Sequence, residues 1–159
     1  MISVLLIGCG NAALTIGNDK RFQNFSHVSA LKDLNIEITA IIDNYPSSET
    51  KIYARNNNIV INRDYDSVIE EYGNKFDLGI FCLPTSKADV TIDILQNINF
   101  KRVLLEKPVS YDSLLAKKIF SILRNNNSRF IVNYQRNWDL GYDSISKWIQ
   151  NNVVTDAYF

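Results

Sequence analysis

The order of apolar runs along the chain predicts an α/β fold built on a doubly wound, mainly parallel sheet. Short runs rich in Val, Ile and Leu alternate with segments of helical periodicity. The apolar runs are mostly continuous rather than alternating, which is typical of strands covered on both faces. The 159 residues are 46% hydrophobic and 21% charged, a composition that suits a globular domain of this class.

Six apolar runs are the expected strands, and each ends at a turn residue, a charge or a proline. The first opens the chain directly before a glycine. The fourth stops at Pro84 and the fifth at Pro108, because proline cannot donate to a central sheet ladder. In chain order the expected strands cover residues 3–7, 36–42, 59–61, 77–82, 102–105 and 129–133.

Helix-period segments lie between these strands, as right-handed crossover connections require. Asparagine clusters at 56–58 and 125–127 follow two of them, and Asn suits helix ends because it tolerates left-handed backbone. After the fourth strand, Thr85 or Ser86 is expected to cap the next helix. The expected helices cover residues 26–34, 47–56, 65–72, 88–96 and 110–125.

The end of the chain departs from this alternation. A helix is expected over residues 142–150 and a strand over 153–159. A terminal strand must pair with something, either the edge of the first sheet or a second sheet. We therefore divide the chain into residues 1–135, the sheet domain, and residues 136–159, a connecting helix and the first strand of a truncated or absent second α/β domain. Edge pairing with a second copy would give a homo-oligomer.

Charge and cysteine content exclude several functional classes. Lys plus Arg and Asp plus Glu each total 17, so the formal net charge is zero and no basic face for nucleic acid is expected. The apolar segment after Met1 is too short to span a membrane and lacks the basic start and cleavage site of a signal peptide. A cytoplasmic location is expected, with Cys9 and Cys82 reduced and buried near strand ends.

The first strand leads directly into a glycine loop, Gly8 to Ala13, of the form Gly-x-Gly-x-x-Ala. In a Rossmann domain the first glycine makes the tight turn, the second lets the backbone approach a pyrophosphate, and the third small residue lets helix and strand pack closely. The loop therefore predicts a dinucleotide site that includes Gly8, Gly10, Asn11 and Ala12. A tight turn without a ligand is the alternative.

Asp43 ends the second strand, where a carboxylate would accept hydrogen bonds from the adenosine ribose and repel a 2′-phosphate. The sequence thus favours NAD over NADP, because the first basic residue after Asp43 is Lys51. Asp43 lies 30 residues after Ala13, which is longer than usual, and residues 17–25 would absorb the excess as a loop. A solvated strand-end acid is the alternative.

The ends of the fourth and fifth strands complete the expected site. Ligands bind at the carboxyl ends of strands in such sheets, which places the turn from Leu83 through Pro84 to Thr85 beside the glycine loop. Lys107 has two interpretations: a strand-end charge paired with Glu106, or a side chain beside the nicotinamide that contacts a substrate hydroxyl.

These motifs together resemble the Gfo/Idh/MocA oxidoreductase family. The resemblance is carried by the glycine loop, Asp43, the run 82–85, the Leu-Glu-Lys-Pro run 105–108 and the run 133–138. It implies a Rossmann domain that binds NAD(P), followed by an α/β substrate domain. It also implies that Lys107 lies by the nicotinamide and assists hydride transfer, and that Glu106 and Pro108 belong to the cofactor pocket. Gln135 or Arg136 would line the nicotinamide side.

One departure from the family pattern and one agreement with it involve histidine. The family often has Pro-Asn-x-x-His after the fourth strand, where this chain has Pro-Thr-Ser-Lys-Ala from Pro84. The sole histidine, His27, begins a helix in which the family often has histidine, and we expect packing or a polar contact near the loop rather than catalysis. No cluster of His, Cys and acids has the spacing of a metal site.

Two functions from different classes follow. The first is the cofactor domain of an oxidoreductase that moves a hydride between nicotinamide and a secondary alcohol of a sugar, cyclitol or nucleotide-sugar, a small-molecule substrate. The second is a non-catalytic NAD(P)-binding module or subunit, inactive alone. A methyltransferase also opens with a glycine loop, but such enzymes usually carry an acid where this chain has Leu6.

Overall fold

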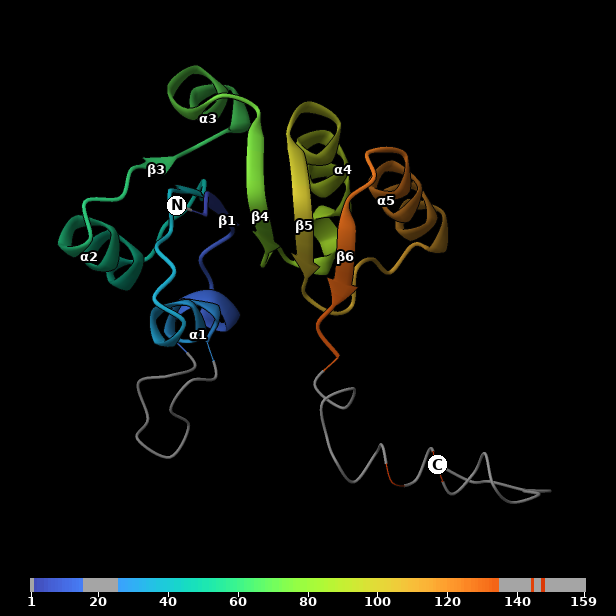
Figure 1. Cartoon of the computed structure of the whole chain (residues 1–159), viewed down its shortest axis with the longest axis horizontal. Coiled ribbons are helices and arrows are strands. Elements are labelled where there is room, and N and C mark those ends of the chain that lie inside the picture. Colours follow the sequence, from blue (N-terminus) through green and yellow to red (C-terminus); the bar gives the residue numbers. More distant parts are fainter. Residues whose placement is uncertain (1, 16–25, 135–143, 145–146, 148–159) are drawn as a thin grey trace.

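The fold is a single six-stranded parallel sheet with helices on both faces (Figure 1). A computed structural model describes residues 2–15, 26–134, 144 and 147 of the chain. The strand order is β3-β2-β1-β4-β5-β6, and every neighbouring pair is parallel. The strands are β1 Val4–Ile7, β2 Ala40–Ile42, β3 Ile61–Asn62, β4 Lys75–Phe81, β5 Asn99–Leu105 and β6 Arg129–Val132.

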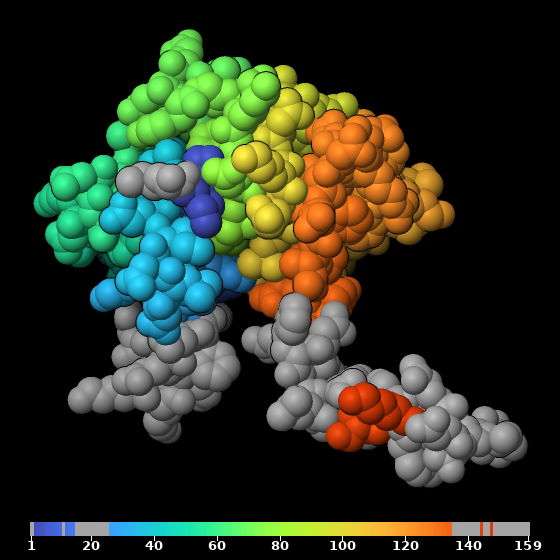
Figure 2. All heavy atoms as spheres, viewed as in Figure 1, coloured from blue at the N-terminus to red at the C-terminus, as the bar shows by residue number. Residues whose placement is uncertain are grey.

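Helices connect successive strands and form two layers around the sheet. Helices α1 and α2 pack on a core cluster of one face, and α3, α4 and α5 pack on the cluster of the other. In the space-filling view the α2 and α5 segments lie at opposite sides of the molecule (Figure 2). The helices are α1 His27–Asp33, α2 Ser48–Asn56, α3 Tyr65–Tyr72, α4 Ala88–Asn97 and α5 Ser113–Asn125, with short turns η1 Asn11–Thr15 and η3 Thr85–Lys87.

The doubly wound parallel sheet predicted from the sequence is confirmed. Both faces of β1 are fully buried, which explains why this strand reads as a continuous apolar run. The strand order reverses direction between β1 and β4, and at such a switch point the loops after the two strands diverge and leave a crevice. The loop after β1 is the glycine loop, so the fold places that motif at the crevice.

Side-chain caps and asparagines fix the helix ends. Ser26 begins α1 with a capping box that involves Ser29, and Asp64 caps α3 through the backbone N–H of Ser67. Asn35, Asn58 and Asn127 follow helix ends and have positive φ, as the asparagine clusters predicted for two of them. The cap predicted after β4 is wrong: neither Thr85 nor Ser86 caps α4, because the turn η3 leads directly into that helix.

The element boundaries differ from prediction mainly where strands carry polar residues. Strand β4 begins at Lys75 and β5 at Asn99, both earlier than hydropathy indicated, because their pairing continues through charged and amide residues. The expected helix over 142–150 lies outside the described residues except for Ser144 and Lys147, which are helical. The strand over 153–159 and the loop over 17–25 also lie outside them. No described helix is long and apolar enough to cross a membrane.

Candidate functional site

The turn after β1 depends on Gly8 for a structural reason. Gly8 has φ +76°, and a Cβ there would lie 2.9 Å from the carbonyl oxygen of Cys82 at the end of β4. Its N–H donates to the carbonyl of Ile42 at 2.8 Å. The residue is therefore a glycine because β1, β2 and β4 converge closely at this point.

Gly10 differs from Gly8 because no described residue packs where its side chain would lie. A Cβ built on Gly10 would meet no atom within 4 Å, and its φ lies outside the left-handed region. The open space in front of its backbone is therefore not filled by packing. Such a cradle fits a group that approaches the loop backbone closely, as a dinucleotide pyrophosphate does in Rossmann domains.

The rest of the glycine loop turns into the helical segment η1, which begins at Asn11. The N–H groups of Ala13 and Leu14 both donate to the carbonyl of Gly10, at 3.0 and 3.1 Å. Ala12 is half-buried, whereas Ala13 is fully buried in the core between η1 and the sheet. A small side chain at position 13 thus lets this segment pack closely against β1.

The Asp43 carboxylate ties the end of β2 to the glycine loop. Its Oδ2 accepts a hydrogen bond from the Cys9 N–H at 2.8 Å, and its Oδ1 accepts one from the Tyr45 N–H at 2.9 Å. The Thr50 hydroxyl of α2 donates to the Cys9 carbonyl at 3.2 Å. Each carboxylate oxygen has two lone pairs, so Asp43 retains acceptor capacity while its orientation is fixed.

A cavity of about 500 Å³ opens beside Asp43, between the end of β3 and the start of α2. Its wall includes an aromatic residue, Tyr45, which is 93% exposed, and two cations, Lys51 and Arg63, of which the sequence related only Lys51 to Asp43. The lining residues are Asp43, Asn44, Tyr45, Pro46, Lys51, Ile61 and Arg63.

The turn after β4 lies against the glycine loop, as the strand order requires. The Cys82 N–H donates to the Ile7 carbonyl at 2.7 Å, and a Leu83 methyl carbon lies 3.2 Å from the position of a Cβ on Gly8. Pro84 is exposed and Thr85 is half-buried at the start of η3. The structure therefore brings this predicted segment to the loop at Gly8.

Glu106, at the end of β5, is the most highly coordinated acid at this edge of the sheet. Because a carboxylate only accepts, His27 Nε2 donates to its Oε1 at 2.6 Å, and Asn133 Nδ2 donates to the same oxygen at 2.7 Å. Its Oε2 accepts from the Lys107 N–H at 3.3 Å. Burial opposes ionisation, yet hydrogen bonds from His27, Asn133 and Lys107 hold the pKa of Glu106 below its usual value.

The sequence indicated Glu106 but missed the network around it. His27 begins α1 and makes the polar contact expected near the loop. The side chains of His27 and Glu106 are only 12% and 16% exposed, respectively. Asn133 was noted only as part of the run 133–138. Its position after β6, the strand paired with β5, was the available signal, because the ends of paired parallel strands lie together.

Lys107 is exposed, and among the described residues its ammonium group forms no ion pair with Glu106. The structural interpretation, a strand-end charge paired with Glu106, is therefore not what the structure shows. Pro108 follows, also exposed, after a cis peptide bond. Gln135 and Arg136 lie outside the described residues.

Both cysteines are free thiols rather than a disulfide. Burial raises the pKa of Cys9 to about 11 and holds the pKa of Cys82 well above its usual value. These thiols are therefore protonated at neutral pH and act as small apolar groups. No group of His, Cys and acids within the described ranges could hold a metal ion.

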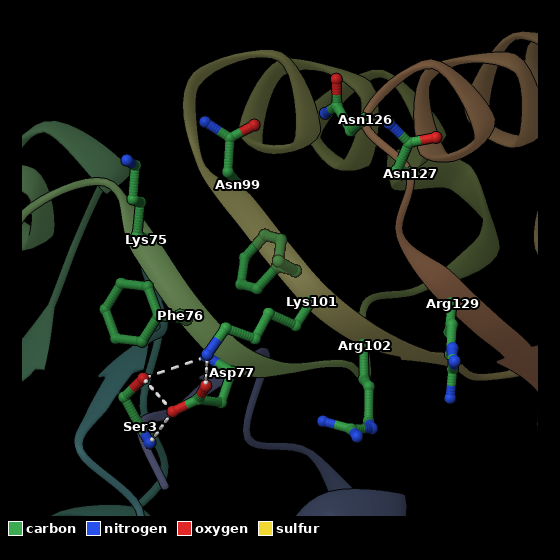
Figure 3. Close-up of a pocket in the computed structure, with 11 residues that line it drawn as sticks. Ser3, Lys75, Phe76, Asp77, Asn99, Lys101, Arg102, Asn126, Asn127 and Arg129 are labelled. Atoms are coloured by element: carbon green, nitrogen blue, oxygen red, sulfur yellow. Dashed lines mark hydrogen bonds and ion pairs between the residues drawn. The ribbon is translucent and has the colours of Figure 1, made fainter.

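A second cavity, of about 600 Å³, lies at the opposite edge of the sheet, among the amino ends of β4, β5 and β6 (Figure 3). Its only acid, Asp77, pairs with Lys101 at 2.6 Å and accepts from the Ser3 N–H and hydroxyl. The Arg102 and Arg129 side chains, from paired residues of β5 and β6, extend side by side. This cavity is separate from the glycine loop.

Comparison with known proteins gives one family match and several structural matches. A family model described as "Oxidoreductase family, NAD-binding Rossmann fold" (GFO_IDH_MocA) matches residues 2–134. A redox-sensing transcriptional repressor, Rex, from Clostridium beijerinckii is 34% identical over 90 residues, which are 57% of this chain and 37% of the repressor.

The structural matches share the fold at low sequence identity. The WlbA dehydrogenase from Chromobacterium violaceum, solved with NADH and UDP-GlcNAcA, has a TM-score of 0.72 and 17% identity over 94% of this chain. KijD10, a 3-ketoreductase from Actinomadura kijaniata solved with TDP-benzene and NADP, has a TM-score of 0.66 and 21% identity over 96%. The chain covers 40% and 44% of these two proteins.

Proposed function

Because the chain belongs to the Gfo/Idh/MocA oxidoreductase family and carries its NAD-binding Rossmann domain, we propose that it is the cofactor-binding part of a sugar-type dehydrogenase or reductase. The complete enzyme would move a hydride between the nicotinamide and a secondary alcohol of a sugar, cyclitol or nucleotide-sugar. The observation that carries the proposal is the open cradle at Gly10, beside a fixed Asp43 carboxylate.

The pyrophosphate end is assigned to the glycine loop. Gly8 allows the tight turn, and the unfilled space at Gly10 would admit the phosphates to backbone N–H groups of the loop. Asn11 and Ala12 follow in the same turn and would lie against the same group. Asp43 would accept hydrogen bonds from the ribose hydroxyls with its remaining lone pairs.

The nicotinamide end is assigned to the ends of β4 and β5. The turn Leu83–Pro84–Thr85 would flank the cofactor, and Glu106 would hold the β5 end in place through His27 and Asn133. The Lys107 ammonium, which pairs with no described acid, would contact the reacting hydroxyl and stabilise charge that develops on its oxygen. Pro108, Gln135 and Arg136 remain predicted members of this pocket. The nicotinamide supplies the hydride chemistry when bound.

The proposed substrate class and partners are inferred from the ligands bound in the structural relatives. The WlbA complex contains a nucleotide-sugar and the KijD10 complex a nucleotide-linked analogue, which supports a sugar-like substrate. The chain covers less than half of either protein, so the substrate class of the complete protein is a proposal. A homo-oligomer formed by edge pairing and a cytoplasmic location stay expectations of the sequence.

Calorimetric titration of the chain with NADH tests the assignment. We expect Gly10→Ala to weaken NADH binding by about tenfold or more, because the methyl group enters the phosphate cradle. Its thermal midpoint should stay close to that of the wild type, because no described residue other than its chain neighbours has an atom within 4 Å of a Cβ at this position. Wild-type protein that binds neither NAD nor NADH would refute the proposal, and equal affinities of wild type and Gly10→Ala would refute the placement of the phosphates.

The catalytic role of Lys107 has its own test. In the complete oxidoreductase, Lys107→Met should lower turnover by about 10²-fold or more while NADH affinity stays within twofold, because general acid–base groups contribute on that scale. Lys87→Met, which removes another exposed lysine near the β4 turn, is the matched control and should keep full turnover. Turnover of Lys107→Met near the wild-type rate would assign catalysis to another residue.

A redox sensor is the second candidate, favoured by the 34% identity to Rex over 90 residues. Such a module would bind the cofactor and transfer no hydride. The ratio of NADH to NAD affinity separates the two: a sensor should prefer NADH strongly, whereas an enzyme that works in both directions should bind both forms. Detectable oxidation of NADH with a keto-sugar would exclude the sensor.

A further inference from the structure

The cavity beside Asp43 holds two cations whose charges no described residue neutralises. Arg63 directly follows β3, and Lys51 lies in the first turn of α2; both side chains are exposed. Neither forms an ion pair or a side-chain hydrogen bond with a described residue. Among the described residues that line the cavity, Asp43 is the only acid, so the cations outnumber the acids in this set.

The register of the sheet explains why these cations meet Asp43. Ile42 of β2 pairs with Asn62 of β3, and the Asp43 N–H donates to the Asn62 carbonyl at 2.9 Å. Asp43 and Arg63 are therefore the next residues along two paired parallel strands. The adjacency of Asp43 and Arg63 is not evident in the sequence, because the two residues are 20 positions apart and only Lys51 follows Asp43 closely.

The Asp43 carboxylate is held toward the loop. Its two oxygens accept from the Cys9 and Tyr45 N–H groups, so part of its negative charge is already compensated inside the protein. An anion in the cavity would lie among Arg63, Lys51 and this partly compensated carboxylate. This arrangement weakens the repulsion on which discrimination against a phosphate depends.

We propose that Arg63 and Lys51 form a 2′-phosphate subsite, so that this chain binds NADP(H) as well as NAD(H). The proposal rests on the proposed function, because it concerns the adenosine end of the same cofactor site. Tyr45, Pro46 and Ile61 would provide the apolar wall for adenine, and the volume of about 500 Å³ suits a nucleoside group. Arg63 would bind the phosphate with two parallel N–H bonds and Lys51 as a point charge.

Calorimetry with NAD and NADP on four proteins tests the subsite. The wild type should bind NADP within about tenfold of NAD, and Arg63→Ala should weaken NADP by about tenfold or more while changing NAD affinity less than twofold. Lys51→Ala should also weaken NADP binding, but by less than Arg63→Ala does. Arg55→Ala is the matched control: Arg55 lies one turn farther along α2, outside the cavity wall, and its loss should leave the ratio of affinities unchanged.

The outcomes separate this inference from the proposed function. Binding of NAD with an unchanged NADP-to-NAD ratio in Arg63→Ala would overturn the subsite and leave the cofactor site intact. NADP affinity more than about a hundredfold below that of NAD in the wild type would also overturn it. If neither dinucleotide bound, both the cofactor site and its 2′-phosphate subsite would be refuted. A steeper salt dependence for NADP than for NAD, lost in Arg63→Ala, would support the ionic contact.

Discussion

Charged residues lie at both edges of the sheet, but the partners and the burial of their side chains differ. At the carboxyl edge, Asp43 and Glu106 each accept hydrogen bonds from other elements, and Glu106 and His27 are mostly buried. At the amino edge, Arg102 and Arg129 are exposed, and Asp77 pairs with a lysine that is 74% exposed. What distinguishes a built site from a solvated edge is thus the burial of the partners: Asp77 is also held by Ser3, but its charged partner Lys101 is exposed, whereas Glu106 is paired with the mostly buried His27.

The difference is energetic as well as geometric. A carboxylate held by several donors in a partly buried place has strong, directional bonds and a high cost when one partner is lost. An ion pair between exposed side chains contributes little, because solvent screens the charges and ordering the side chains costs entropy. Substitutions at the two edges should therefore differ in size, which the following predictions measure.

The largest effect is expected at the carboxyl edge, for Gly8→Ala. A left-handed alanine costs about 1–2 kcal/mol, and a methyl group pressed against the Cys82 carbonyl adds about 1–3 kcal/mol. We expect the free energy of unfolding, measured in urea, to fall by about 2–5 kcal/mol. Gly10→Ala is the internal control with no protein contact; a loss as large as that of Gly8→Ala would contradict the account of both glycines.

The next effect is expected for Glu106→Gln, which removes the negative charge from the acceptor shared by His27 and Asn133 and replaces one carboxylate oxygen with an NH2 donor. The loss should be about 1–3 kcal/mol at pH 7, the range for hydrogen bonds that involve a charged group. Folding lowers the pKa of Glu106, so its contribution is complete above the ordinary value of 4.5 and is lost as the pH falls through the lower, folded value. The difference between wild type and variant should shrink accordingly below pH 4.5.

Glu70→Gln provides the matched control for that pH profile. Glu70 is an exposed acid of α3, and its replacement should leave stability nearly unchanged at every pH. Denaturation curves collected from pH 3 to pH 8 would show whether the stability difference between the wild type and each variant depends on pH. A constant difference between the wild type and Glu106→Gln across that range would show that Glu106 acts through packing rather than through its ionised carboxylate.

The same comparison explains what could be predicted from the sequence. The continuous apolar runs and the glycine loop suffice for the fold, because they report burial on both faces and a turn that only glycine permits. The position of Asp43 and Glu106 at strand ends follows from the same runs. The surroundings of these acids do not. His27 and Asn133, which bond Glu106, and Arg63, which shares a cavity wall with Asp43, are brought in by strand order and register rather than by proximity in the chain.

The smallest effect is expected at the amino edge, for Lys101→Ala. Hydrogen bonds from Lys101 and from the Ser3 backbone and hydroxyl hold the pKa of Asp77 far below its usual range, and two of these three donors survive the substitution. The pKa of Asp77, followed by NMR, should rise, while the thermal midpoint should fall less than in Glu106→Gln and even less at high salt. Lys75→Ala, which removes an unpaired lysine of the same cavity, is the control. A loss in Lys101→Ala as large as that in Glu106→Gln would mean that the amino edge, too, is a built site.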